Sequence, residues 1–305
     1  MQASSLPELR PLSLGQLLDR AFRLYRNNFL VFIGIIAITQ LPAILMQIGL
    51  SSFTALDSTD AFLQSQDPDA MIELLPIIGI AAGVTILLGL VSGIFAIIGT
   101  AAMTRAVADN YLGKSVTIMG SFSKIGRSWL TLFGTLLLMG LIGFFIAIPL
   151  VLIAIIPCLG WAVAFLGFVG LGAISALLTP VVIIEKQGGL DAIKRAWELF
   201  RLRSWWVIGY FLLIILMAYI VILGPSLIAI SMFGVIAPSA GQLVASIVQQ
   251  SVTYLFSIIF MPIQLAAITL MYFDLRIRFE GFDLMILAQS DDLYEKKPET
   301  LLDLE

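Results

Sequence analysis

The sequence contains no histidine and a single cysteine, Cys158, among its 305 residues. Histidine is the commonest general base and metal ligand near neutral pH, so its absence removes the usual zinc sites and Ser–His catalysis. One cysteine cannot form a disulfide within the chain. Charged residues make up only 12% of the sequence, and none lies inside the long apolar stretches, where such residues mark proton relays and ion pathways. We therefore expect no catalytic residue, no metal and no cofactor, and predict that the protein is not an enzyme.

What the sequence has instead is apolar residues, which make up 60% of the chain and give a mean hydropathy of +1.03. About 20 consecutive apolar residues suffice for a helix to cross a membrane. The stretches of that kind lie at about 29–49, 74–104, 129–156, 160–184, 205–224 and 251–273. The charge-free run 129–184 is long enough for two of them, with Pro157 and Gly160 marking the turn. The expected fold is an all-α integral membrane protein with six transmembrane helices.

The basic residues predict the orientation of these helices. All 17 lysines and arginines lie in four segments, 1–28, 105–128, 185–203 and 274–305, whereas segment 51–73 is acidic. Because basic loops face the cytoplasm, we expect both termini there and a location in the cell membrane. A seventh span within 226–250 would place the last four bases outside, so we interpret 226–250 as a re-entrant or externally lying helix. The membrane domain would cover 1–284, followed by an acidic, disordered cytoplasmic tail over 285–305. Nothing indicates binding of nucleic acid.

Three segments on the predicted cytoplasmic side read as amphipathic helices: 14–28 after the N-cap residue Ser13, roughly 117–128, and 191–203. Each sets an apolar stripe against a basic face, which is typical of helices that lie in the membrane plane. Their bases would form a basic collar that binds anionic lipid or a cytoplasmic protein partner. In the other interpretation the stripes pack on one another beneath the bundle, or on a partner, and the bases are solvated orientation signals. The collar residues are Arg20, Arg23, Arg26, Lys194, Arg195, Arg201 and Arg203.

An internal repeat is visible at an offset of 175 residues. The matching pairs are Arg20/Arg195, Ala21/Ala196, Phe22/Trp197, Leu24/Leu199, Tyr25/Phe200, Arg26/Arg201, Ile33/Ile208 and Gly34/Gly209. A weaker match at an offset of 100 pairs Phe22, Phe29 and Gly34 with Phe122, Trp129 and Gly134. The repeating unit would be one in-plane helix, one span outward and one span back, used three times.

Glutamines and glycines are the notable residues inside the spans. Gln40, Gln249, Gln250 and Gln264 are candidates for a polar substrate or lipid pathway, although Gln40 and Gln264 could instead satisfy carbonyls freed by the nearby Pro42 and Pro262. Gly79, Gly83, Gly89 and Gly93 share one face of the second span. Small residues let helices approach closely in lipid, so these glycines predict helix packing within the chain or in a homo-oligomer.

Three segments carry a resemblance to a known family: Leu9–Phe29, Ala192–Trp206 and Tyr272–Leu284. In this order they resemble the prokaryotic glycerophosphoryl diester phosphodiesterase membrane-domain family. The resemblance implies a multi-helix module of the cell membrane, in some members fused to a soluble phosphodiesterase domain. No stretch here fits that domain, and the histidines its chemistry needs are absent, so no catalytic residue carries over.

Two function classes follow from the sequence. The first is a non-catalytic membrane module that organises lipid or docks a soluble partner on its cytoplasmic face. The alternative is a transporter or lipid-handling protein with an uncharged pathway through the membrane. The missing intramembrane charges count against proton coupling but leave sodium sites made of carbonyls, hydroxyls and amides open. We favour the membrane module.

Overall fold

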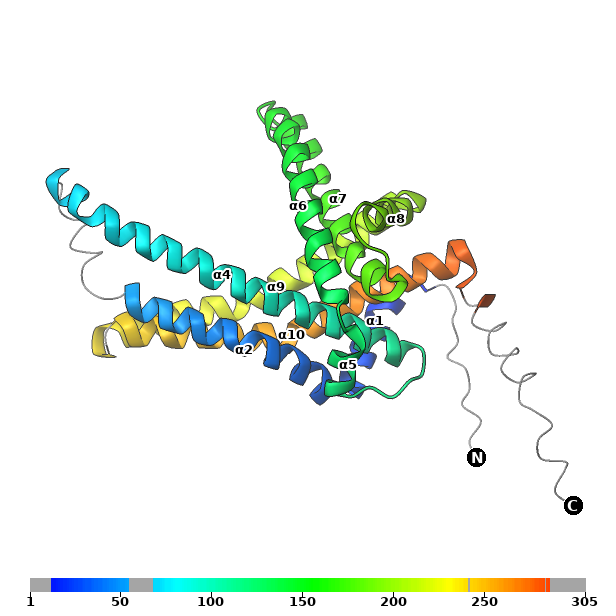
Figure 1. Ribbon diagram of the computed structural model, residues 1–305, viewed down its shortest axis with the longest axis horizontal. Helices are drawn as coiled ribbons and strands as arrows, with labels where there is room; N and C mark the ends of the chain where they lie inside the picture. Colours follow the sequence, from blue (N-terminus) through cyan, green and yellow to red (C-terminus); the bar gives the residue numbers. More distant parts are fainter. Residues whose placement is uncertain (1–11, 55–67, 241, 283, 286–305) are drawn as a thin grey trace, which may run out of the picture.

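A computed structural model describes residues 12–54, 68–240, 242–282 and 284–285 of the chain (Figure 1). Within these residues every regular element is a helix and no strand occurs. The elements are α1 (Leu14–Asn27), α2 (Phe29–Thr54), α4 (Pro68–Tyr111), α5 (Ile118–Ile125), α6 (Ser128–Ile153), α7 (Leu159–Pro180), the π-helical turn η1 (Val181–Glu185), α8 (Gly189–Leu202), α9 (Ser204–Ala240) and α10 (Gln242–Glu280).

Six of these helices are long and apolar enough to cross a membrane. Their apolar parts are Phe29–Met46, Ala82–Tyr111, Ser128–Ile153, Leu159–Glu185, Ser204–Met232 and Ile247–Glu280. The prediction of an all-helical, multi-pass membrane protein is confirmed at this level. The acidic tail, apart from residue 285, and most of the acidic segment 51–73 lie outside the described residues.

The turn predicted at Pro157 and Gly160 separates α6 from α7 as expected. Cys158 adopts a positive φ of 63°, which is unusual for a residue with a side chain. A Cβ atom at position 160 would lie 2.0 Å from the carbonyl oxygen of Ile153, so only glycine fits where the two helices close on each other. The hairpin thus depends on one residue that lacks a side chain.

Segment 226–250 differs from the prediction. Helix α9 continues through Pro225 to Ala240, and α10 begins at Gln242, so the segment is not a helix of its own. Its re-entrant or external position stays a prediction. A proline within a helix removes one hydrogen bond, but a long apolar helix packed against a neighbour tolerates that loss. Here α9 and α10 contact each other closely. The fifth span is therefore longer than the sequence indicated.

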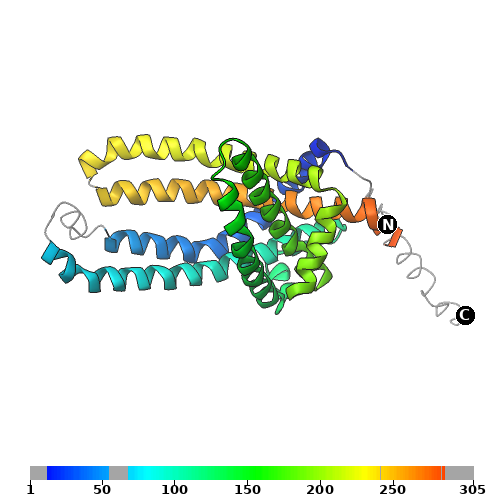
Figure 2. The same cartoon turned by 90° about the horizontal axis from the view of Figure 1, so that it is seen from above.

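The long helices form two groups, which Figures 1 and 2 show from two directions. Helices α2, α4, α9 and α10 run alongside one another as a four-helix arm. The α6–α7 hairpin projects to the side, across the direction of the arm. The short helices α1, α5 and α8 gather with the C-terminal turns of α10 where arm and hairpin meet, and we call this region the base. The six apolar helices therefore do not form one parallel bundle.

The hydrophobic core lies in the base. The C-terminal half of α10 is buried almost continuously from Ala266 to Leu275. Helix α10 contacts α1, α2, α4, α7, α8 and α9. Small side chains on the adjoining helices, such as Ala102, Ala106, Ala173 and Ala196, are fully buried and allow this close approach. The far parts of the arm and hairpin expose large apolar side chains, as expected of surfaces that meet lipid.

The three amphipathic segments are all helices, α1, α5 and α8, and each is followed by two long helices. Ser13 is the N-cap of α1, as predicted, and forms a reciprocal capping box with Gln16. The order of elements is the order that the proposed repeat requires. A position in the membrane plane and a structural similarity among the three units stay predictions.

Candidate functional site

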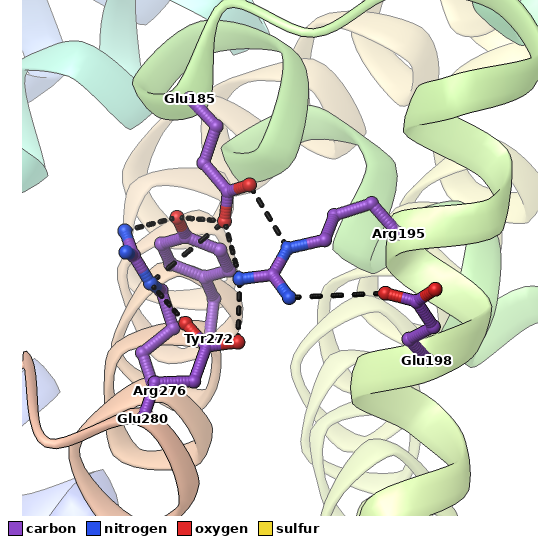
Figure 3. A network of polar contacts seen from close by, with 6 residues as sticks. All are labelled: Glu185, Arg195, Glu198, Tyr272, Arg276 and Glu280. Carbon is purple, nitrogen blue, oxygen red and sulfur yellow. Dashed lines mark hydrogen bonds and ion pairs between the residues drawn. The ribbon is translucent and has the colours of Figure 1, made fainter.

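Five polar side chains in the base form what we call the Glu185 network, with Glu198 at its edge (Figure 3). Arg195 on α8 donates through Nε to Glu185 at 2.9 Å and pairs through its Nη2 with Glu280 at 2.5 Å. The Tyr272 hydroxyl donates to Glu185 at 2.8 Å. Arg276 donates to that hydroxyl at 3.1 Å and to Glu280 at 2.9 Å. Two carboxylates thus face two guanidinium groups, and the charges balance.

The backbone places Glu185 at the end of an unusual turn. After Pro180 the α7 helix widens to the π-helical turn η1, and Lys186 then ends it in a left-handed conformation with φ of 58°. Such π turns are rare and re-aim the side chains that follow them. Glu185, only 10% exposed, is thereby held between α8 and α10.

The electrostatics of Arg195 show how well its charge is compensated. Burial lowers the pKa of its guanidinium, but hydrogen bonds and charge interactions with Glu185 and Glu280 outweigh burial, so the net pKa is raised. A base with a raised folded-state pKa contributes stability that is fully present below its unfolded pKa, which for an arginine lies far above neutral pH. Arg195 therefore stays charged, and its stabilising effect does not vary, throughout the physiological range.

A second polar clamp holds the start of α1 against α10. The buried Asp274 carboxylate accepts from the backbone N–H of Leu12 at 2.8 Å and from Arg278 Nε at 2.7 Å. Arg278 also donates to the carbonyl oxygen of Leu12 at 2.6 Å. The last turns of α10 therefore fasten α1 through Asp274 and α8 through Glu280.

A third cluster joins α4 to α5. The buried Asp109 carboxylate pairs with Lys124 at 2.6 Å and with Arg105 at 3.2 Å. Close by, the Arg20 guanidinium lies 4.6 Å from the ring centroid of Tyr111, in reach of a cation–π interaction. All three short helices are thus attached to the base by charged groups as well as by apolar faces.

The predicted collar divides into two sets. Arg20 and Arg195 are partly buried and engaged inside the protein, in the contacts just described. Neither interpretation predicted these two positions, because internal partners occupy their guanidinium groups, which are neither solvated nor directed at lipid. The other collar residues are exposed: Arg23, Arg26, Lys194, Arg201 and Arg203. Exposed aromatic residues Phe22, Phe29, Trp197 and Trp205 accompany them.

The structure places Gln40 apart from Gln249 and Gln250. Gln40 donates to the sulfur of Met261 on α10 at 3.5 Å. Gln250 and Gln249 lie about 16 and about 18 Å from Met261 along α10, at a rise of about 1.5 Å per residue. Gln250 has a buried side-chain oxygen without a hydrogen-bond partner. Beside Pro262, the hydroxyl of Tyr25 donates to the carbonyl oxygen of Ile259 at 2.7 Å. A cavity of about 180 Å³ within the arm is lined by none of the four glutamines; its lining is Ala43, Met46, Thr85, Leu88, Gly89, Ser92 and Tyr254.

The glycines of α4 face open space. A Cβ atom added at Gly79, Gly83, Gly89 or Gly93 would meet nothing within 4 Å. No neighbouring helix approaches closely at these four positions, although Gly89 lines the cavity between α2, α4 and α10. Close contact occurs instead at Gly99, where a Cβ would lie 2.3 Å from the Thr39 hydroxyl. Packing with a second chain stays a prediction.

Sequence reasoning missed the acidic partners Glu185, Asp109 and Asp274. Each lies just beyond an apolar stretch, among the bases from which the orientation is predicted. That position was a usable signal, because an acid at a span end has several bases within reach. Among the residues placed by the structure, no three acidic or cysteine side chains gather as metal ligands.

The fold and these clusters define the class of the protein: a helical, multi-pass membrane protein whose base is held together by buried charges. Comparisons with models of known families, with curated proteins and with solved structures found no match. The resemblance to the glycerophosphoryl diester phosphodiesterase membrane-domain family therefore stays a prediction.

Proposed function

We propose that the protein is a non-catalytic membrane module whose cytoplasmic base binds anionic lipid headgroups. The observation that carries this proposal is the way α1 and α8 join the arm. One residue, Asn28, separates α1 from α2, and Arg203 alone separates α8 from α9. Exposed bases such as Arg26 and Arg203 are thus within one turn of a membrane-spanning helix, at the depth of the headgroups.

Exposed aromatic residues beside these bases support the same proposal. Phe29 is 43% exposed at the start of α2, and Trp205 is 77% exposed at the start of α9. Aromatic rings are enriched where hydrocarbon meets headgroups, and nearby bases gain about 1 kcal/mol each from anionic lipid. The transporter alternative has less support, since Gln40 lies apart from Gln249 and Gln250.

Neutralising the five exposed bases tests the proposal. The variant R23Q/R26Q/K194Q/R201Q/R203Q, reconstituted in nanodiscs of mixed phosphatidylglycerol and phosphatidylcholine, is expected to lose most of its preference for the anionic lipid. The charge-retaining variant R23K/R26K/K194R/R201K/R203K should keep it. Fluorescent-lipid energy transfer measures the preference, after correct insertion is checked. An unchanged preference in the neutral variant would mean that these bases act only as orientation signals.

A second expectation concerns catalysis. The purified protein should hydrolyse neither glycerophosphodiesters nor peptides, because the sequence has no histidine and no acidic or basic residue within the apolar stretches 29–49, 74–104, 129–156, 160–184, 205–224 and 251–273. Product release from glycerophosphocholine and from a peptide library, followed by mass spectrometry, provides the measurement. Turnover that persists after contaminating hydrolases are removed would reveal a catalytic site and contradict the non-catalytic part of the proposal.

A further inference from the structure

We infer that a hollow on α1 is a specific site for a phospholipid whose headgroup phosphodiester carries one negative charge. This rests on the proposed function and assigns one lipid to one place. The hollow has a volume of about 380 Å³. Its lining comes from α1 and the first residue of α2: Asp19, Phe22, Arg23, Tyr25, Arg26 and Phe29.

The floor of the hollow is held in place from beneath. The Tyr25 hydroxyl donates to the carbonyl oxygen of Ile259 on α10. The Tyr25 and Phe29 rings meet edge to face, with centroids 5.2 Å apart. Burial raises the pKa of the Tyr25 hydroxyl, which keeps it protonated as this donor. A ligand would therefore meet a preformed surface, which lowers the entropy cost of binding.

The charge of the lining selects the headgroup. Arg23 and Arg26 supply two positive charges and Asp19 one negative charge, a surplus of one. Asp19 is already paired with Arg23, so the site suits a phosphodiester with one charge. A phosphomonoester gains a second charge above its second pKa of about 6, and one surplus charge matches it less well.

The position of the hollow selects a lipid over a soluble phosphate. Phe29 begins the first apolar span, and the next residue, Leu30, is 80% exposed. Phe22, 43% exposed, adds a second apolar wall. A headgroup between the arginines would place its glycerol and acyl chains against these rings.

Two variants with the same loss of charge test the site. Native mass spectrometry in mild detergent, with titrated phosphatidylglycerol, measures lipid retained by R23Q/R26Q and by K114Q/K186Q, which removes two exposed bases outside the five tested above. We expect the first variant to bind about 10- to 30-fold more weakly, from the usual effect of two bases, and the second to bind within about threefold of wild type. R23K/R26K should retain binding, which separates charge from misfolding.

The other possible outcomes distinguish failure of the α1 site from failure of the proposed function. Equal weakening in both double variants would overturn the α1 site and leave the proposed function standing. A wild-type protein without preference for phosphatidylglycerol over phosphatidylcholine would overturn both. D19N should shift the preference toward phosphatidic acid, and an unchanged ratio would contradict the charge argument. Displacement of the lipid by equimolar soluble glycerophosphoglycerol would mean that the apolar wall is irrelevant and would overturn a lipid site.

Discussion

Arg195→Ala is expected to lower the free energy of unfolding by about 3 kcal/mol, near the lower end of the range for breaking a buried ion pair. Arg195 bridges Glu185 and Glu280, and all three side chains are 20% exposed or less. Without Arg195, the nearest base to both carboxylates is Arg276. Arg276 lies 2.9 Å from Glu280 but 3.8 Å from Glu185, so Glu185 loses its close ion pair. Circular dichroism melting in detergent should show a midpoint lower by roughly 5–10 °C.

The matched control is Arg201→Ala on the same helix, where the side chain is exposed. It should shift the midpoint by less than about 2 °C, because exposed charges contribute about 1 kcal/mol or less. Arg195→Lys should fall between the two, since one ammonium group cannot present the forked N–H donors that reach both carboxylates. Equal melting of the two alanine variants would show that the Glu185 network does not stabilise the base.

The contrast between Arg195 and Arg20 shows which features of the structure could be predicted from the sequence and which could not. Charge asymmetry, apolar length and helical periodicity are local properties, and they predicted the all-helical class, the apolar helices and the Ser13 cap. The repeat aligned Arg20 with Arg195 because both follow the same pattern along their helices. Their environments nevertheless differ: Arg20 lies over the ring of Tyr111, while Arg195 pairs with Glu185. Those partners come from distant segments and have no local signature.

In the candidate site, too, local properties were predicted from the sequence and contacts between distant segments were not. Exposure of Arg23, Arg26, Lys194 and Arg201 agrees with the polar face of each helical pattern, whereas Arg203 lies just after the end of α8. For the glycines of α4 the sequence was less informative. A face of small residues indicates that another helix can approach closely, but it does not identify that helix. Pro225 was overestimated as a helix stop because tertiary packing against α10 outweighs a local preference. The direction of the α6–α7 hairpin depends on how buried residues such as Leu177 and Leu178 pack, which no periodicity encodes.

Asp274→Ala is expected to loosen α1 selectively. Asp274 is the most deeply buried of the paired acids, with 1% of its side chain exposed, and it accepts from both the Leu12 backbone and Arg278. Without it, Arg278 loses its carboxylate and the Leu12 N–H loses its acceptor. Removing one partner of a buried pair costs about 3–5 kcal/mol. Hydrogen–deuterium exchange should show faster exchange across α1, while α8, which is held through Glu280, changes little.

The Arg195→Ala variant is expected to show the opposite pattern of hydrogen exchange, which makes the prediction more specific. That variant should speed exchange in α8 and leave α1 protected, because the two helices are fastened to different side chains of α10. Asp274→Asn should keep the bond to the Leu12 N–H through its amide oxygen while weakening the bond to Arg278, so α1 should loosen only partly. Asp19→Ala, which removes an exposed acid of α1, serves as the control and should not alter exchange. Uniform loosening of α1 and α8 in both buried-site variants would mean that the base opens as one unit, and that α10 does not hold the two amphipathic helices independently.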